Sequence, residues 1–214
     1  MTESTKKRGR PRAFEPEAVL PRAFETFLRH GYAGTSIDGL AEAMGLNKPS
    51  LYAAFGDKRK LFQRVIDERV LTLSRRFKSA LDRGAAGGSL ESVLRELFLE
   101  AVEVYDEQPG CVVVSAAVTE ATVDDALATF TREFFERSDR ALAASFAPHL
   151  PAKSPVSAAT LGRLANGVIH DIALRARVGE SKAKLRAYAK DSAHALSASS
   201  SSSSSSPTSR EPRS

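Results

Sequence analysis

The chain has 214 residues, of which 42% are hydrophobic and 27% charged, and its formal net charge is +5. This composition is typical of a globular protein, and the single cysteine, Cys111, excludes an internal disulfide framework and fits a reducing compartment. The sequence contains neither an apolar run of about 20 residues that would span a membrane nor a signal peptide. We therefore expect a cytoplasmic protein with no membrane partner.

The positive charge is concentrated near the N-terminus. Residues 1–60 contain 11 Lys and Arg against seven acids, which accounts for +4 of the total. Five of these Lys and Arg residues lie in the basic run KKRGRPR at Lys6 to Arg12. A basic end on a nearly neutral body is typical of a protein that binds a polyanion. A solvated basic tail is the alternative interpretation.

Apolar residues recur with helical spacing along almost the whole chain, and the alternating pattern of strands is absent. The first helix is expected over residues 16–30, ended by Gly31. Pro16 suits its first turn, whereas Pro21 predicts a kink or a late start.

Two short helices and a long one follow. We expect Thr35 to cap the second helix, with Asp38 reaching back in a capping box, and Gly45 to end it. Asn47 then caps a third helix over residues 48–55. A fourth helix follows Asp57 and runs to about residue 83.

Helical patterns resume after the glycine-rich residues 84–88, so the fold class is all-α. Further helices are expected at about 89–107, 111–121, 124–146, 157–178 and 181–196, with a loop at 148–155. Eight consecutive serines begin at Ser199, and we expect a disordered Ser-rich tail over residues 198–214 because serines offer no apolar area to offset ordering.

Residues 35–55 have the pattern of a helix-turn-helix, whose second helix lies in the DNA major groove. The first turn of that helix carries Lys48, Pro49 and Ser50, and Lys48 can donate to guanine O6 and N7. Hydroxyls and backbone N–H groups at the start of the preceding helix suit phosphate binding. The predicted DNA-binding residues are Arg10, Arg12, Thr35, Ser36, Lys48, Pro49, Ser50, Tyr52 and Lys58. Capping alone is the alternative for Thr35, packing for Tyr52, and ordinary solvation for Lys48 and Lys58.

Residues 14–61 resemble the DNA-binding domain of the TetR family of transcriptional regulators. The matching segments are HGYAGTSIDGLAEAMGL and NKPSLYAAFGDKRKLF. Thr35-Ser36, the turn Gly45, Leu51-Tyr52-x-x-Phe55 and Lys58-x-x-Leu61 correspond to recurrent family positions. The Gly9–Arg12 arm, GRPR, is also frequent in such proteins, where it suits the minor groove.

The resemblance implies a ligand-released repressor that binds a palindromic operator as a homodimer. It divides the chain into a flexible basic arm (1–12), a three-helix helix-turn-helix domain (13–60, motif 36–55), a larger effector-binding and dimerisation domain (61–197) and the tail (198–214). The dimer would form through the helices at about 157–178 and 181–196, which offer apolar faces with small residues between them. The alternative is that these faces complete the core of a single chain.

The resemblance also implies a pocket for an unknown small-molecule effector in the second domain. Candidate lining residues are Tyr105, Cys111, Phe134, Asn166 and His170. A thiolate at Cys111 would be favoured at a helix start and could sense redox state or metal, but a buried inert thiol is the default. Asn166 and His170 share a helix face, where core or interface hydrogen bonding is the competing explanation. No cofactor, metal site or catalytic residue is expected.

Two other classes compete with the repressor. An enzyme is disfavoured because no recognisable catalytic or nucleotide-binding motif occurs. An architectural DNA-binding protein would not need a second domain of about this size, so a regulator explains more of the chain.

Overall fold

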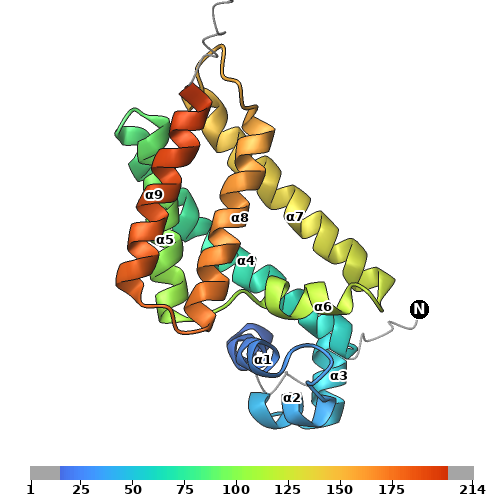
Figure 1. The fold of residues 1–214 in the computed structure, drawn as a ribbon. Coiled ribbons are helices and arrows are strands. Elements are labelled where there is room, and N and C mark those ends of the chain that lie inside the picture. Colours follow the sequence, from blue (N-terminus) through green and yellow to red (C-terminus); the bar gives the residue numbers. More distant parts are fainter. Residues whose placement is uncertain (1–14, 202–214) are drawn as a thin grey trace, which may run out of the picture. The chain divides into compact units, whose positions relative to one another are not determined.

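The structure, a computed structural model, describes residues 15–201, and every regular element in that range is helical (Figure 1). This confirms the all-α class. The α-helices within these residues are α1 (Pro16–His30), α2 (Ile37–Met44), α3 (Lys48–Phe55), α4 (Lys58–Ala86), α5 (Leu90–Glu107), α6 (Val118–Glu120), α7 (Asp125–Phe146), α8 (Ala158–Arg177) and α9 (Lys182–Ser201). A π-helical turn, η1 (Val113–Ala117), leads into α6, and a 3-10 turn, η2 (Ala147–His149), follows α7.

The chain divides into two compact units between Glu68 and Arg69, inside α4, whereas the sequence placed the boundary at residue 60. The first turns of α4 belong to the N-terminal unit because they complete its core. Phe62 is fully buried and packs edge-on against Phe27 (ring centroids 4.9 Å apart) and Tyr32 (5.0 Å). Further buried side chains of this core are Leu20, Leu40, Met44, Leu51, Phe55, Leu61 and Ile66.

Helix α1 is continuous from Pro16 through Pro21, so the late start suggested by Pro21 does not occur. Pro16 lies in the first turn, where the missing N–H would have no helical partner. Pro21 is exposed, so its ring faces solvent while Leu20, Ala23 and Phe24 are buried beside it.

The second helix is capped by Ser36 and not by Thr35. The Ser36 hydroxyl accepts the backbone N–H of Gly39 at 3.0 Å. Thr35 is only 3% exposed, and its hydroxyl donates to the Gly31 carbonyl at 2.6 Å. The cap therefore lies one residue later than predicted, because the Thr35 hydroxyl closes the preceding turn. The capping box with Asp38 does not form: the Thr35 N–H donates to the Tyr32 carbonyl and Asp38 pairs with Lys48.

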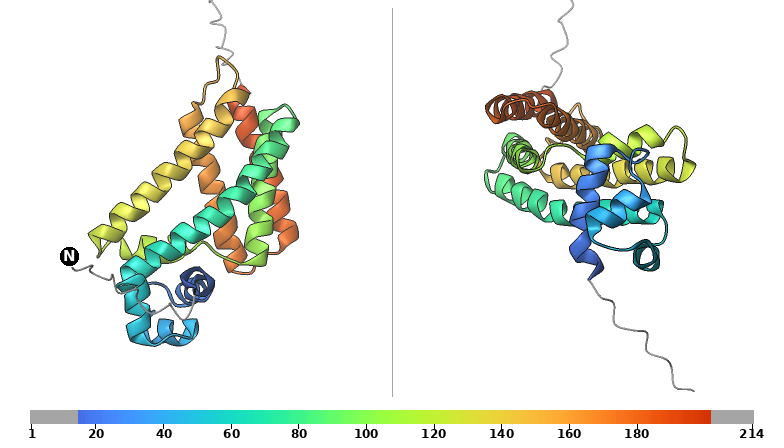
Figure 2. Two further views of the ribbon diagram at one scale, coloured as in Figure 1. Left: turned by 180° about the vertical axis from the view of Figure 1, so that it is seen from behind. Right: turned by 90° about the horizontal axis from the view of Figure 1, so that it is seen from below.

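The C-terminal unit consists of long helices packed side by side. Helix α8 contacts α7, α5 and α9, and α5 and α9 also lie side by side (Figures 1 and 2). Gly162 allows the close approach of α8 to α7, since a Cβ at that position would lie 2.6 Å from the Asp139 carbonyl oxygen. Fully buried apolar residues of this unit include Leu94, Leu97, Phe98, Phe146, Leu161, Ile172 and Ala193.

Three boundaries in the C-terminal unit differ from those predicted. The segment predicted as one helix at 111–121 starts with the π-turn η1, and the loop predicted from residue 148 contains the end of η2. Helix α9 continues five residues beyond Leu196. In this extension the Ser199 and Ser200 hydroxyls donate to the Leu196 carbonyl and the Ser201 hydroxyl donates to the Ser197 carbonyl. The predicted tail therefore begins later than residue 198; its remainder, 202–214, lies outside the described residues.

Candidate nucleic-acid interface

Helix α3 exposes a polar first turn, while its apolar residues are buried in the core of the N-terminal unit. The Asn47 side-chain oxygen accepts the Ser50 N–H at 2.8 Å and so caps the helix as predicted. Leu51 and Phe55 face the core, at 0% and 5% exposure. Lys48, Pro49 and Tyr52 are exposed, with Tyr52 at 50%. The helix therefore holds its predicted reading side chains on its outer surface.

The turn before α3 fixes its direction relative to α2. Gly45 has φ 68, in the left-handed region that favours glycine. Its N–H donates to the Glu42 carbonyl, and the Leu46 N–H donates to the Ala41 carbonyl. This turn brings Lys48 to the start of α2, where its ammonium pairs with the Asp38 carboxylate at 2.5 Å. The sequence did not indicate this pair, because Asp38 was interpreted as part of a capping box.

Two further predicted residues flank this surface. Ser36 is exposed at the start of α2, while Thr35 beside it is buried. Lys58 opens α4 behind the Asp57 cap, whose Oδ1 accepts the Lys60 N–H at 2.8 Å. The Lys58 ammonium lies 4.3 Å from the centre of the Tyr32 ring, a cation–π contact that keeps this lysine half-buried. Arg10 and Arg12 lie outside the described residues.

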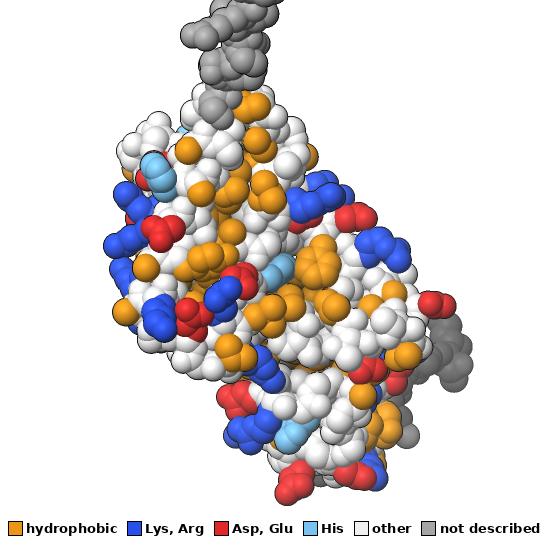
Figure 3. Space-filling model, in the orientation of Figure 1, with side chains coloured by type: hydrophobic (Ala, Val, Ile, Leu, Met, Phe, Trp, Pro, Cys, Tyr) orange, Lys and Arg blue, Asp and Glu red, His pale blue; other side chains and the backbone are white. Residues whose placement is uncertain are grey.

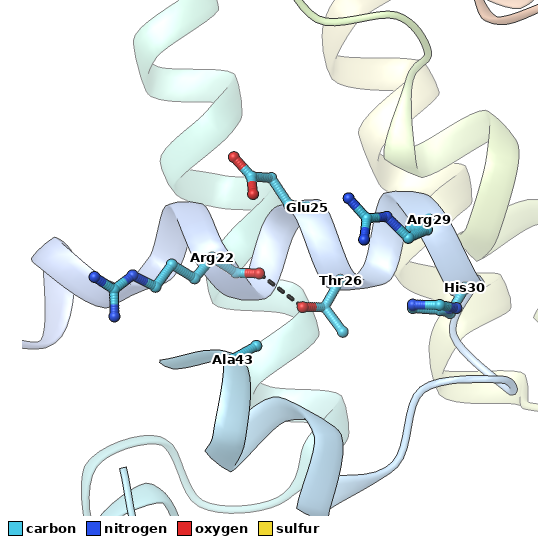
Figure 4. Close-up of a pocket in the computed structure, with 6 residues that line it drawn as sticks. All are labelled: Arg22, Glu25, Thr26, Arg29, His30 and Ala43. Carbon is cyan, nitrogen blue, oxygen red and sulfur yellow. Dashed lines mark hydrogen bonds between the residues drawn. The ribbon is translucent and has the colours of Figure 1, made fainter. Parts of the chain in front are cut away.

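A shallow hollow of about 340 Å³ lies between α1 and α2 (Figure 4). Its polar lining comes mainly from the outer side of α1, and Thr26 there donates to the Arg22 carbonyl at 2.8 Å. The lining residues are Arg22, Glu25, Thr26, Arg29, His30 and Ala43. Because acidic and basic side chains are mixed in it, the hollow lacks the single sign of charge that would select an ion.

The candidate effector residues separate into two clusters in the C-terminal unit. In the first, Tyr105 is 4% exposed and interacts with Cys111, and Arg69 of α4 is electrostatically coupled to both. Burial raises the pKa of the Cys111 thiol and raises that of Tyr105 well above its usual value. Both groups are therefore neutral near pH 7, and the inert thiol is favoured over a reactive thiolate at Cys111.

The second cluster lies where α7 meets α8. The Asn166 amide donates to the Ser138 hydroxyl at 3.0 Å and to Asp139 at 2.8 Å. His170 packs against the rings of Phe134 and Phe135, and burial lowers its pKa to about 4. Asn166 thus has structural hydrogen bonds, which supports the core-bonding explanation of this residue.

Within residues 15–201 no group of three or more His, Cys, Asp or Glu side chains is arranged to hold a metal ion. None of the helices in that range is both long and apolar enough to cross a membrane.

A short helix, a glycine turn and a second, exposed helix with a polar first turn form the helix-turn-helix of DNA-binding proteins. Comparisons with known proteins extend this assignment. Residues 19–65 match the family model described as bacterial regulatory proteins, tetR family. The HTH-type transcriptional repressor ComR of Escherichia coli K12 is 29% identical over 195 residues, covering 86% of this chain and 91% of that protein. An uncharacterised HTH-type transcriptional regulator of Bacillus subtilis, YezE, is 31% identical over 141 residues, covering 64% and 69%.

A solved structure shows the same fold in contact with DNA. A cysteine-substituted form of the TetR family regulator CifR, complexed with 26-base-pair double-stranded operator DNA, is 30% identical, with a TM-score of 0.74 and coverage of 87% of this chain and 99% of that one. The chain therefore belongs to the TetR family of bacterial transcriptional regulators. It is a DNA-binding regulator and not an enzyme.

Proposed function

We propose that this protein is a transcriptional repressor that binds a near-palindromic operator as a homodimer and is released by a small-molecule effector. The main support for DNA binding is the exposed surface of α3, where Lys48, Pro49 and Tyr52 face outward while Leu51 is buried. Similarity to the repressor ComR and to the operator-bound CifR supports the same role. A protein with this role works in the cytoplasm, where bacterial operators lie.

In this proposal the DNA contacts are divided by type. Lys48, Pro49, Ser50 and Tyr52 approach base edges and the adjoining backbone. Phosphates would be met at the start of α2 by Ser36 and the backbone beside Thr35, and at the start of α4 by Lys58. The arm residues Arg10 and Arg12 would enter the minor groove.

The proposed dimer surface is narrower than the sequence suggested. Several apolar residues of α8 and α9 are buried within the single chain: Leu161, Ile169, Ile172, Ala173, Leu185 and Ala189. Helix α8 still exposes Leu164 (46%), Leu174 (41%) and, just after its end, Val178 (83%). Figure 3 shows hydrophobic side chains gathered on this face of the C-terminal unit. We propose that a second copy covers them.

An effector would find partners near η1 and α7, which contact each other. Within the described residues, the buried hydroxyls of Ser115 on η1 and Thr131 on α7 have no hydrogen-bond partner. Buried hydroxyls are normally bonded, so these two suit a small ligand with a polar group. Cys111 lies one turn before Ser115, whose N–H donates to the Cys111 carbonyl at 2.8 Å.

The test is selection of duplexes from a random library by the full-length protein. We expect one enriched, near-palindromic sequence bound by two chains. Lys48→Ala should relax preference at one position of each half-site, whereas Lys58→Ala should weaken all duplexes alike and reduce the salt slope by about one. Enrichment of no sequence would refute the repressor proposal. Release of the selected duplex by compounds from a small-molecule panel would identify the effector.

A further inference from the structure

The ion pair between Asp38 and Lys48 joins the two helices of the helix-turn-helix. Asp38 is the second residue of α2 and Lys48 is the first of α3, and the Gly45 turn brings them together. The Asp38 Oδ1 lies 2.5 Å from the Lys48 Nζ, and the two side chains are 70% and 54% exposed. A strong acceptor and a strong donor therefore stand side by side at the edge of the reading helix.

Folding stability does not account for this pair. Exposed ion pairs contribute little to the free energy of folding, because water screens them and both side chains lose freedom. A carboxylate on a surface that approaches DNA also repels phosphates and lowers affinity for every duplex. The position of Asp38 is therefore unfavourable for DNA binding unless its carboxylate meets a hydrogen-bond donor on the DNA.

The major-groove edge of a G·C pair offers the matching arrangement. Guanine presents O6 and N7 as acceptors, and cytosine presents its N4 amino group as a donor. O6 and N4 are joined by the pair's own N–H···O bond of about 2.9 Å, close to the 2.5 Å between the two side-chain atoms. With the Lys48 ammonium donating to O6 and the N4 amino group donating to the Asp38 carboxylate, the four groups would form a closed ring of hydrogen bonds in which donors and acceptors alternate.

A T·A pair fits less well. Its thymine O4 and adenine N6 also stand side by side, but thymine carries a methyl group where guanine offers its second acceptor. On the other side, the adenine N7 acceptor lies beside N6 and repels a carboxylate that approaches N6. The ion pair therefore discriminates at both of its ends.

We propose that Asp38 is a specificity-determining residue that accepts a hydrogen bond from cytosine N4 while Lys48 donates to the paired guanine. This inference rests on the proposed sequence-specific binding and adds a residue that the helix-turn-helix pattern did not indicate. It makes α2 a contributor to base recognition as well as to phosphate contact.

The experiment compares base preferences of three full-length proteins: wild type, Asp38→Asn and Glu42→Gln. Duplexes are selected by wild type, and affinities are then measured for every single-base change in one half-site. Both variants remove one negative charge from α2 at an exposed position, so Glu42→Gln is the matched control. Thermal unfolding of each protein verifies that it is folded.

We expect Asp38→Asn to lose about 10-fold of the preference for cytosine at one position. Adenine should become tolerated there, because an asparagine amide pairs with adenine N6 and N7. Glu42→Gln should keep the wild-type preferences and bind all duplexes slightly better. Two further proteins, Lys48→Gln and the double variant Asp38→Asn with Lys48→Gln, complete the set. The double variant should lose no more discrimination than the more affected of the two single variants, since the two residues read one base pair.

Two results would overturn the inference, and they are distinguishable. If wild type enriches a sequence but Asp38→Asn changes all affinities alike, Asp38 is only a repelling charge and the proposed function stands. If wild type enriches no sequence, the proposed function fails and the role of Asp38 fails with it.

Discussion

The N-terminal and C-terminal units differ in the interactions that stabilise each of them internally. In the N-terminal unit, side chains adjacent in sequence fix each short helix: Ser36 caps α2, Asn47 caps α3 and Asp57 caps α4. Gly45 and Gly56 end two of these helices with positive φ. The direction of each helix is thus set within a few residues, which keeps the surface of α3 in place.

The C-terminal unit has caps of this kind at Ser89, Asp124 and Ser157 as well, and adds ion pairs between residues far apart in sequence. Arg76 of α4 bonds to Glu100 (2.7 Å) and Glu107 (2.6 Å) on α5, and Lys182 of α9 bonds to Glu103 (2.7 Å). Long helices held by such contacts can shift relative to one another while each stays intact. Under the proposed function, the first unit preserves the DNA-reading surface while the helices of the second adapt to the effector.

The largest effect is expected for Phe62→Ala, which tests whether the two cores are separate. Phe62 is fully buried between Phe27 and Tyr32, and its loss should destabilise the N-terminal unit by about 3–5 kcal/mol. Hydrogen exchange should accelerate in α1, α2 and α3, while α5, α8 and α9 retain their protection. Equal acceleration in both units would show that they unfold as one.

A pH titration should affect the C-terminal unit through His170. Burial lowers the pKa of His170 to about 4, so the folded state disfavours its protonated form. The stability gained from the neutral ring is complete above about pH 6.5 and is lost as pH falls toward 4, by up to about 3 kcal/mol. Chemical unfolding of wild type and His170→Gln should differ in slope over this range, since glutamine does not titrate. Parallel curves would contradict the prediction.

A smaller effect is expected for the cap of the reading helix. Asn47→Ala removes the acceptor of the Ser50 N–H and should cost about 1 kcal/mol. Operator affinity should fall as well, because the first turn of α3 frays. Asn47→Asp keeps a capping oxygen and is the control: it should retain the stability that alanine loses. If alanine and aspartate behave alike, the cap does not support α3.

Local signals predicted much of the fold. Five polar residues were expected at helix starts, and each side chain accepts a backbone N–H from the first turn of its helix. They are Asn47, Asp57, Ser89, Asp124 and Ser157. Such caps work because the side chain and the free N–H groups are two or three residues apart. Where two hydroxyls were adjacent, at Thr35 and Ser36, the sequence could not show which was engaged elsewhere.

Long-range features were less predictable. The apolar residues of α8 were visible as a pattern, but the pattern did not separate those facing α5, α7 and α9 from Leu164, Leu174 and Val178, which remain exposed. The π-turn η1 was missed because apolar spacing does not distinguish it from an α-helix. The five candidate effector residues proved to lie in two clusters, one around Tyr105 and one around His170.

The all-helical class, the helix-turn-helix and most helix starts could be predicted from the sequence alone, because each depends on residues within a few positions of one another. The burial of Thr35, the pairing of Asp38 with Lys48 and the packing of His170 against two phenylalanine rings could be seen only in three dimensions. These depend on how the chain turns at Gly45 and how α7 meets α8. The electrostatic environment and packing of a side chain depend on such contacts between helices, which a pattern along the sequence does not specify.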